Sequence, residues 1–581
     1  MVKQCRWLRV FVFFLGLGFA QGQEPTVNDW RADVDAIVND IRLLHPDPFT
    51  KTGRRKFLRE VAALKEAIPK LSREQRTVRA MELVALIGDG HTILEPDNAS
   101  FAYWYPIRVY QFSDGYFVSS AHKTVKELAG AQVLEIAGRP IEEVAQRARA
   151  LLGADNPAAA KDRTWALHSA GLMKGLGFAE ADGSVRVKAK LRTGAIVEKV
   201  LSPSRTDHPR YKPNDSSFEW QFRPEMFGLP FGADEDWFSA YKGLRASDFQ
   251  TPDPSRPPHL TDRKAFGARS LPEHDAYYVR TNYVSDTDFI PFFQRVMKEV
   301  DEQKPKRLIL DWRFNFGGDS SKMYLVTREF IKRADNPPWK ELYILTGQKT
   351  FSAAIMALDA FLDNLPVTVI GEPSPAGLNH FGDPTSRKYS RTGLALNVST
   401  LWHQLSSSDD LTQSVAVDVP APFTFADYVN GRDAAVDPIL RGEEMRSIPV
   451  IARANGGAAA RAAYLARKAK FGSLEWWSPP KEYDLRQACD ELRGQQRLAD
   501  ALETCKLNAE IHPHVWNVWY NLAIAQRAAG QMKERLASYR CVVAIAPDNW
   551  NVPSIKRLLA QAGNEGEELA PGCPVEVKTS R

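Results

Sequence analysis

The chain has 581 residues, of which 44% are hydrophobic and 25% are charged. Such a composition suits a globular protein of about three to five domains and excludes a chain made mainly of disordered segments or membrane spans. The 76 Lys and Arg residues against 71 Asp and Glu residues give a net charge of +5. This near balance does not indicate the concentrated basic surface of a nucleic-acid-binding protein.

Residues 1–20 have the pattern of a secretory signal peptide. Lys3, Arg6 and Arg9 precede an apolar run at 10–17, and the small residues that follow suit a signal peptidase. No later window has the roughly 18 apolar residues that a membrane-spanning helix needs. We therefore expect cleavage after this segment and a periplasmic or secreted protein with no stable membrane span; an uncleaved anchor is the alternative.

Residues 21–100 are predicted to form a helical segment with three helices. The first helix has apolar residues at intervals of three and four, behind a cap at Asn28 or Asp29. Ser72 and Gln75 have the spacing of a capping box and predict the start of the third helix.

Residues 101–203 change to a pattern of short strands and helices. The segment 128–141 resembles the carboxylate-loop half of a PDZ-like module, which binds peptide ends by adding a strand to its sheet. An ordinary α+β subdomain without a ligand is the alternative. Three connecting stretches are also expected: an irregular connection at 204–265, a linker at 451–480 and a tail at 561–581.

Residues 266–450 alternate strand and helix patterns, which is typical of an α/β core. Strands are predicted at 307–312, 342–345 and 367–370. The helix between the last two is expected to bury four apolar side chains, Leu362 among them.

A sequence repeat marks the C-terminal region. Pro513 and Pro547 have the same separation as Trp516 and Trp550. This separation is the period of the tetratricopeptide repeat, a helix-turn-helix unit of about 34 residues. We therefore expect α-helical tetratricopeptide-like repeats over 481–560, which offer a surface for a protein partner.

Four cysteines remain after removal of the signal peptide. An even number in an oxidising compartment favours disulfides, and their spacing matches no zinc pattern. Alignment of the repeat units places Cys489 and Cys505 on two helices that pack against each other in the tetratricopeptide motif. This resemblance implies that they are bonded, which leaves Cys541 and Cys573 as the second pair. Four separate buried thiols are the alternative.

Ser352 has the local setting of a nucleophile. It follows a strand and a glycine-containing turn and opens a helix, where the dipole and the free amides favour negative charge. The amide of Ala353 is placed to bind an oxyanion. Gly317 and Gly318 follow a second strand and can bring another amide close to a substrate because they lack side chains. An ordinary helix N-cap is the alternative role of Ser352.

Four motifs in this order resemble those of the tail-specific, or C-terminal processing, peptidase family. They are Leu-Ile-Gly-Asp-Gly-His-Thr at 86–92, the strand and glycine turn at 309–319, Thr-Phe-Ser-Ala-Ala at 350–354 and Ile-Gly-Glu-Pro at 370–373. With the helical front end and the PDZ-like segment, the resemblance covers residues 28–445. It implies a crotonase-like α/β protease core with Ser352 as nucleophile and with Gly318 and Ala353 as oxyanion donors.

The general base departs from the common pattern of this family. Many members use a lysine in a Gly-Lys-Gly turn one strand after the serine, whereas residues 371–380 contain no lysine. The sequence therefore looks closer to the tricorn-core branch, in which a histidine from the front of the domain is the base. His91 matches that position, and an imidazole suits proton transfer near neutral pH. His380 is the competing base, with a loop histidine bonded to backbone as its other role. The orienting carboxylate stays open among four candidates, Asp89, Glu372, Asp433 and Asp437.

The sequence thus predicts an exported serine endopeptidase that acts on polypeptides, in which Ser352 attacks the carbonyl and His91 transfers the proton. No His and Glu cluster has the spacing of a metal site, and no glycine-rich turn carries the lysine of a phosphate loop, so neither a metal nor another cofactor is implied. The alternative, which the absent lysine motivates, is a catalytically inactive peptide- or ligand-binding scaffold protein of the same fold.

Overall fold

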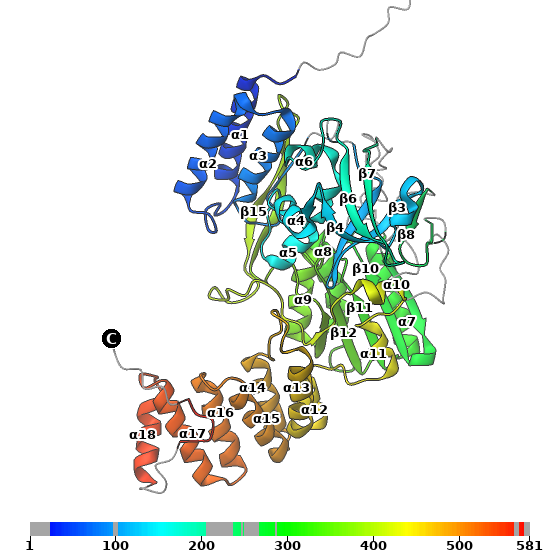
Figure 1. The fold of residues 1–581 in the computed structure, drawn as a ribbon. Coiled ribbons are helices and arrows are strands. Elements are labelled where there is room, and N and C mark those ends of the chain that lie inside the picture. The colour runs from blue at the N-terminus through cyan, green and yellow to red at the C-terminus, as the bar shows by residue number, and fades with distance from the viewer. Residues whose placement is uncertain are drawn as a thin grey trace, which may run out of the picture.

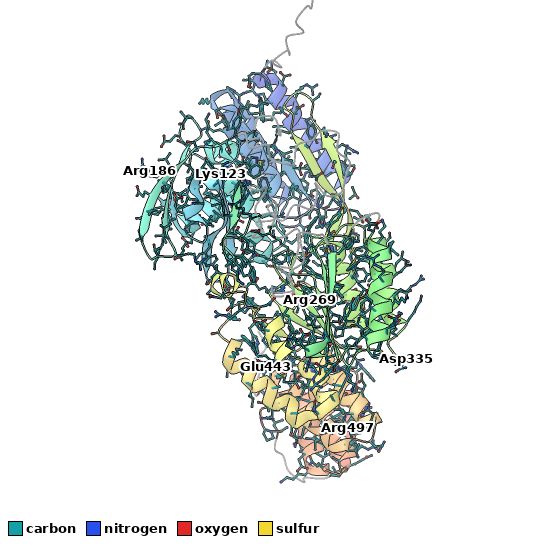
Figure 2. All side chains as sticks on the ribbon, turned by 90° about the vertical axis from the view of Figure 1, so that its right-hand side faces the viewer. Lys123, Arg186, Arg269, Asp335, Glu443 and Arg497 are labelled. Atoms are coloured by element: carbon teal, nitrogen blue, oxygen red, sulfur yellow. A yellow bond between two sulfur atoms is a disulfide. The ribbon has the colours of Figure 1, made fainter. Side chains whose placement is uncertain are left out.

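The computed structural model describes residues 24–96, 101, 103–204, 236–245, 248, 266–284, 288–562 and 569–574. The predicted signal peptide and most of the predicted connection at 204–265 lie outside these ranges. The described chain is a mixture of helices and three sheets. Figure 1 shows the N-terminal helices at one end, the parallel-sheet core in the middle and the C-terminal helices at the other end. In Figure 2, Arg186 of the antiparallel sheet lies in the upper part of the molecule, Arg269 of the core in the middle and Arg497 among the C-terminal helices at the bottom.

The N-terminal segment contains the three predicted helices. They are α1 (Val27–Leu44), α2 (Arg54–Ala67) and α3 (Arg73–Ala85). The predicted cap of α1 is wrong, because Thr26 caps the helix and Asp29 is the third residue inside it. The Thr26 hydroxyl accepts the amide of Asp29, whose carboxylate accepts the amide of Thr26. The predicted capping box of Ser72 and Gln75 at the start of α3 is present.

Residues 103–204 form an antiparallel sheet with helices beside it. The strands are β2 (Ile107–Phe112), β3 (Gly115–His122), β4 (Gln132–Ile136), β5 (Arg139–Pro140), β6 (Val185–Lys190) and β7 (Ile196–Leu201). The helices are α4 (Ile141–Arg149), α5 (Pro157–Asp162) and α6 (Ala170–Gly175). The strand order is β2-β3-β4-β6-β7, with β5 beside β4. We call this unit the module below; its PDZ-like assignment stays a prediction.

The connection predicted to be irregular at 204–265 contributes a strand to the module. Strand β8 (Trp237–Ser239) pairs antiparallel with β3, and Trp237 lies opposite His122. The Trp237 ring is buried, and the Arg108 guanidinium lies 4.5 Å from its centroid. Burial of this aromatic ring explains why the segment is ordered against the sheet.

The core is a six-stranded sheet in the order β16-β13-β12-β11-β10-β9. Its strands are β9 (Phe266–Leu271), β10 (Ala276–Thr281), β11 (Arg307–Asp311), β12 (Glu341–Thr346), β13 (Val367–Gly371) and β16 (Val419–Pro420). All neighbours pair parallel except β9 with β10. The predicted α/β core is therefore present, and its strands contain the three strands expected from the sequence.

Helices cover both faces of this sheet. One face packs against α7 (Phe289–Gln303), α8 (Ser320–Ile331) and α9 (Ala353–Asn364), and the other packs against α11 (Val436–Arg441), which follows α10 (Phe425–Val429). Alternation along β10 separates the faces, since Tyr277 joins the first apolar cluster and Tyr278 the second. The expected burial of Leu362 on α9 is wrong. Its side chain is 37% exposed because the inward stripe of α9 is completed by Leu358 and Phe361.

A long hairpin joins the core to the N-terminal helices. Strands β14 (His380–Lys388) and β15 (Ala395–His403) pair antiparallel, and β15 also pairs with β1 (Ile93–Glu95). At the hairpin tip, the Thr392 amide and hydroxyl both donate to the buried Asp33 carboxylate of α1 at 2.9 Å. The Tyr389 hydroxyl donates to Asp40 at 2.8 Å. Polar contacts at the tip and the β1 pairing thus fix both ends of this junction.

The C-terminal region is mainly helical between residues 448 and 561. Its helices are α12 (Ile448–Asn455), α13 (Gly457–Phe471), α14 (Glu482–Gly494), α15 (Leu498–Ile511), α16 (Trp516–Ala528), α17 (Met532–Ile545) and α18 (Val552–Gln561). The linker predicted at 451–480 is therefore wrong over most of its length. Alanine has high helix propensity, and α13 buries Ala460 and Tyr464 in one cluster with α12, α14 and α15.

The period of the sequence repeat coincides with the helix starts. Helix α14 begins at Glu482 and α16 at Trp516, and α15 and α17 begin with the same separation, at Leu498 and Met532. The name tetratricopeptide repeat stays a prediction for these helices. Over the described residues, we find no helix with the length and apolar character that crossing a membrane requires.

The four cysteines lie in the two predicted pairs. Cys489 of α14 and Cys505 of α15 have Cα atoms 5.7 Å apart, and the Cα atoms of Cys541 and Cys573 are 6.0 Å apart. Both pairs are at disulfide-bonding distance. The first pair ties two consecutive helices together, and the second ties α17 to the chain after α18.

Loss of the first disulfide should destabilise the C-terminal helices. The double variant Cys489→Ser with Cys505→Ser opens a loop with a sequence separation of 16, and the chain-entropy model gives a loss of about 3 kcal/mol. We expect faster amide hydrogen exchange in peptides from α14 and α15, while core peptides from β11 and β12 serve as the control. Unchanged exchange in α14 and α15 would contradict the prediction.

Candidate functional site

The candidate site lies at one edge of the parallel sheet. Strands β10, β11, β12 and β13 run parallel, so their carboxyl ends meet at the same edge. The loops 312–319 and 347–352 follow β11 and β12 there, and Glu372 follows β13. Ligand and active sites of α/β sheets form at this edge, because the loops that follow the strands are free to vary.

Ser352 stands at the mouth of helix α9 in a strained backbone conformation. Its φ is 55° and its ψ is −124°, which non-glycine residues rarely adopt. Its side chain makes no capping hydrogen bond, so the N-cap role is not the one that this serine performs. The residue is partly exposed. A strained, uncapped and accessible hydroxyl at a helix N-terminus has the properties of a nucleophile on a sharp turn.

Hydrogen bonds from the neighbouring loop hold the strained turn in place. The Phe351 amide donates to the Asn315 carbonyl at 2.9 Å. The Thr350 hydroxyl donates to the Trp312 carbonyl at 2.8 Å and accepts the amide of Gly347 at 2.9 Å. The loops after β11 and β12 are therefore one rigid unit around Ser352.

The two glycines after β11 have different roles in this unit. Gly317 has a φ of 97°, and a Cβ atom there would lie 2.6 Å from the Cβ of Ser352 and 3.0 Å from the Ala353 nitrogen. Its own amide donates to the Asn315 side chain at 3.0 Å. Gly318 has a φ of 130°, and a Cβ atom there would lie 2.4 Å from the Val284 carbonyl oxygen. Gly317 thus allows the close approach of the two loops.

Two backbone amides beside Ser352 are free to bind a negative charge. Within the described part of the chain, neither the Gly318 amide nor the Ala353 amide donates a hydrogen bond. Ala353 is the first residue of α9, where the helix dipole also favours an anion. These are the two amides that the sequence singled out as oxyanion donors.

The N-terminal segment brings His91 to the turn that carries Ser352. Its ring stacks on Phe351, the residue before Ser352, with centroids 4.3 Å apart and an interplanar angle of 25°. Both ring nitrogens are buried, and neither has a hydrogen-bond partner among the described residues. Burial lowers the pKa of His91 to about 4, although the charge of Asp89 acts in the opposite direction. The imidazole is thus neutral near pH 7 and free to accept a proton.

Asp89 is the carboxylate closest to His91. Its Oδ1 lies 4.0 Å from the His91 Nδ1 and accepts the His91 amide at 2.9 Å. Its Oδ2 accepts hydrogen bonds from the side chains of His45, Thr92 and Ser399. Burial alone would raise the pKa of Asp89, but these hydrogen bonds and the charge of His91 hold it well below its usual value.

His45 and Ser399 belong to the site although the sequence did not single them out as site residues. His45 Nε2 lies 3.3 Å from the Asp89 carboxylate, and its Nδ1 accepts the Asp47 amide. No motif in the sequence links His45 to the turn at 88–92. Its contact depends on how α1 packs beside α3, and that of Ser399 depends on the β1–β15 register.

His380, the competing base, is occupied by its own loop. Its Nδ1 lies 3.1 Å from the Gly377 carbonyl and 2.9 Å from the Leu378 carbonyl, so this nitrogen is the donor. The ring is buried, and its centroid lies 6.3 Å from that of His91. Burial lowers the pKa of His380 as well. These contacts fit the backbone-bonded loop histidine better than the base.

The other candidate carboxylates are engaged elsewhere. Asp433 pairs with Arg313, which also binds Asp311, and Asp437 accepts the Asp433 amide. Glu372 accepts the Phe423 amide, and burial raises its pKa. Over the described ranges, Asp89 alone of the four comes within 4.0 Å of the His91 ring. The same ranges contain no group of three His, Cys, Asp or Glu residues suited to a metal ion.

Comparisons with known proteins give only distant similarities. No family model and no curated protein matches the sequence. Similar solved structures include mature CPAF in complex with lactacystin, with 12% identity, a TM-score of 0.48 and coverage of 72% of this chain and 99% of that one. The photosystem II D1 C-terminal processing protease has 13% identity, a TM-score of 0.34 and coverage of 68% and 93%. The tricorn protease has 12% identity, a TM-score of 0.35 and coverage of 72% and 36%. Values this low assign neither a family nor an activity to this chain.

Substitution of Gly317 by alanine should disrupt the nucleophile turn. The added methyl group would overlap the Ser352 Cβ, and displacement of a reacting group by about 1 Å can cost about 100-fold in rate. We expect Gly317→Ala to lower the rate at which a fluorophosphonate probe labels Ser352 by about that factor.

Gly194→Ala is the matched control for this variant. Gly194 has a similar φ of 89°, and no atom lies within 4 Å of the added Cβ, so strain is introduced without a clash. Labelling should stay at the wild-type rate. If the Gly317→Ala protein were labelled at the wild-type rate, the close approach of the two loops would not be needed for the reactivity of Ser352.

Proposed function

We propose that this chain is an exported serine endopeptidase of the tail-specific, or C-terminal processing, type that hydrolyses polypeptides. The observation that carries the proposal is the convergence of three groups at one sheet edge. These are the strained, uncapped Ser352, the unbonded His91 imidazole stacked on the adjacent Phe351, and the free amides of Gly318 and Ala353. Together they match the requirements for acyl transfer through a serine.

In the proposed reaction, the neutral His91 imidazole removes the hydroxyl proton as Ser352 attacks the peptide carbonyl carbon. The carbonyl oxygen becomes an oxyanion, which the amides of Gly318 and Ala353 stabilise. His91 then returns the proton to the leaving amine, and the peptide bond breaks to give an acyl-enzyme. Water, deprotonated by the same imidazole, then attacks that ester, and Ser352 leaves as the alcohol with the proton that His91 returns.

Asp89 has the role of the third group in this proposal. The proton transfer leaves a positive charge on a buried ring, and an ionised carboxylate at 4.0 Å stabilises that charge. The four hydrogen bonds that Asp89 accepts keep its carboxylate ionised and fixed. Asp89 therefore orients the turn and supports the imidazolium ion.

The remaining parts of the chain have supporting roles in the proposal. The module positions the substrate, and the C-terminal helices dock a protein partner. Export fits the two disulfide-distance cysteine pairs, since disulfides persist in oxidising compartments. The alternative, an inactive binding scaffold, rested on the missing lysine; an available imidazole beside Ser352 weakens that argument.

Three substitutions test the roles assigned to the nucleophile and the base. Ser352→Ala should abolish labelling by a fluorophosphonate probe and cleavage of an unstructured polypeptide. His91→Ala should lower the labelling rate by about 100-fold to 10,000-fold, the usual contribution of a general base. His380→Gln should retain most of the rate, since its contacts are with backbone. Rapid labelling of the His91→Ala protein would refute the assignment of the base.

The pH dependence of labelling should report the unusual basicity of His91. Only the neutral imidazole accepts a proton, and burial lowers its pKa to about 4. The labelling rate should therefore stay high as the pH falls below the usual histidine value of about 6.5 and decline only near pH 4. Circular dichroism at each pH identifies any loss caused by unfolding. A decline centred near pH 6.5 in the folded protein would contradict the buried, unbonded state of this ring.

A further inference from the structure

One loop of the module lies directly against the turn that carries His91. Gly153, in the loop that follows α4, approaches so closely that a Cβ atom there would lie 2.2 Å from the Asp89 carbonyl oxygen and 2.8 Å from that of Thr92. Only glycine fits such an approach. The module and the turn are therefore in direct backbone contact.

Side chains of the module hold both polar groups of Gly90. The Asp155 carboxyl accepts the Gly90 amide at 2.9 Å, and the Arg163 guanidinium donates to the Gly90 carbonyl at 3.1 Å. A Cβ atom on Gly90 would lie 2.5 Å from Asp155 Oδ2 and 2.8 Å from the Phe351 ring. Asp155 thus reaches the turn beside the ring on which His91 stacks.

A lysine of the N-terminal segment bonds both to the turn at 88–92 and to the loop of the module. Lys51 Nζ donates to the Gly88 carbonyl at 2.7 Å and to the Asp155 carbonyl at 2.6 Å. The Asn156 side chain extends the same loop to the core, where it donates to the Ser374 carbonyl at 3.0 Å. The loop is therefore fixed to three parts of the protein.

We propose that Asp155 is a positioning residue for His91, acting through the Gly90 amide, and that its charge state alters the environment of the imidazole. This inference rests on the proposed function only for its effect on catalysis. The groups that face the carboxyl are Asp89 and Gly90 of the turn, Lys51 of the N-terminal segment and Arg163 of the module.

Asp155 changes its charge near neutral pH. Burial of the carboxyl, followed by repulsion from Asp89, raises its pKa to about 7. Below that pH the group is neutral and is compatible with the ionised Asp89. Above it, a second negative charge stands near Asp89, on the carboxyl that accepts the amide of Gly90, the residue before His91. The His91 ring, already neutral at these pH values, should sense this charge through its electronic environment.

Two variants separate the two parts of the proposal. Asp155→Asn retains an oxygen that can accept the Gly90 amide but cannot ionise. Asp155→Leu removes the acceptor as well. If Asp155 positions the base, the leucine variant should lose about 10-fold or more in kcat with KM within twofold, because His91 is displaced while substrate binding is not. The asparagine variant should retain kcat at pH 6.

The charge state is tested by NMR on protein with ¹³C-labelled histidine, in which His91→Gln assigns the resonance. In the wild-type protein the His91 Cε1 signal should shift with a midpoint near pH 7, and this step should vanish in Asp155→Asn. Asp182→Asn, an exposed acid of the same module, should leave the step unchanged. Persistence of the step in Asp155→Asn, or its absence in the wild type, would overturn the charge effect.

The NMR measurement needs no turnover, so it distinguishes failure of this inference from failure of the proposed function. Suppose the wild-type protein neither reacts with the probe nor cleaves the polypeptide, yet its His91 signal shows the Asp155-dependent step. This result would refute the proposed peptidase function and support the effect of Asp155 on His91. In the leucine variant, an unchanged His91 resonance would overturn the positioning role. Circular dichroism and the signals of the other histidines show whether that variant is folded.

Discussion

Pairing of β1 with β15 is the interaction on which the site depends. It places Ile93 opposite Asn397, from a distant part of the sequence, and the Ser399 hydroxyl then donates to the Asp89 carboxylate. His91 lies just before β1, so the register of this pair sets the position of its ring. A slip of one residue would turn every side chain of β1 to the opposite face and remove the contact with Asp89.

The hydrogen bonds around Ser352, and the glycine that allows them, offset the strain in its backbone. A non-glycine residue with positive φ costs on the order of 1–3 kcal/mol. Bonds from the turn to the Asn315 and Trp312 carbonyls are comparable in total, since each contributes about 1 kcal/mol. The absence of a side chain at Gly317 lets the two loops approach closely enough to make them. The arrangement of the site at this sheet edge thus depends on backbone geometry as much as on side chains.

Local patterns in the sequence predicted most helices and strands and the turn that carries Ser352. They did not predict contacts between segments that are distant in the sequence. Helix periodicity, the Ser72 capping box and the C-terminal repeat can be recognised in one chain, because each is a regular spacing of residue types. His45 and Asp155 carry no local signal, because their contacts with the turn at 88–92 arise from packing of α1 and from the path of the module. The helices at 448–471 were missed because an alanine-rich stretch has little apolar contrast, although its intrinsic helix propensity is high.

The order in which the chain is synthesised gives the hairpin of β14 and β15 a further significance. The turn with His91 emerges from the ribosome early, yet its partner strand ends only at His403. Until that strand has been made and paired, the imidazole has no fixed place beside Ser352. A nascent or still unfolded chain therefore lacks an assembled site, so the proposed peptidase would stay inactive until the hairpin has folded.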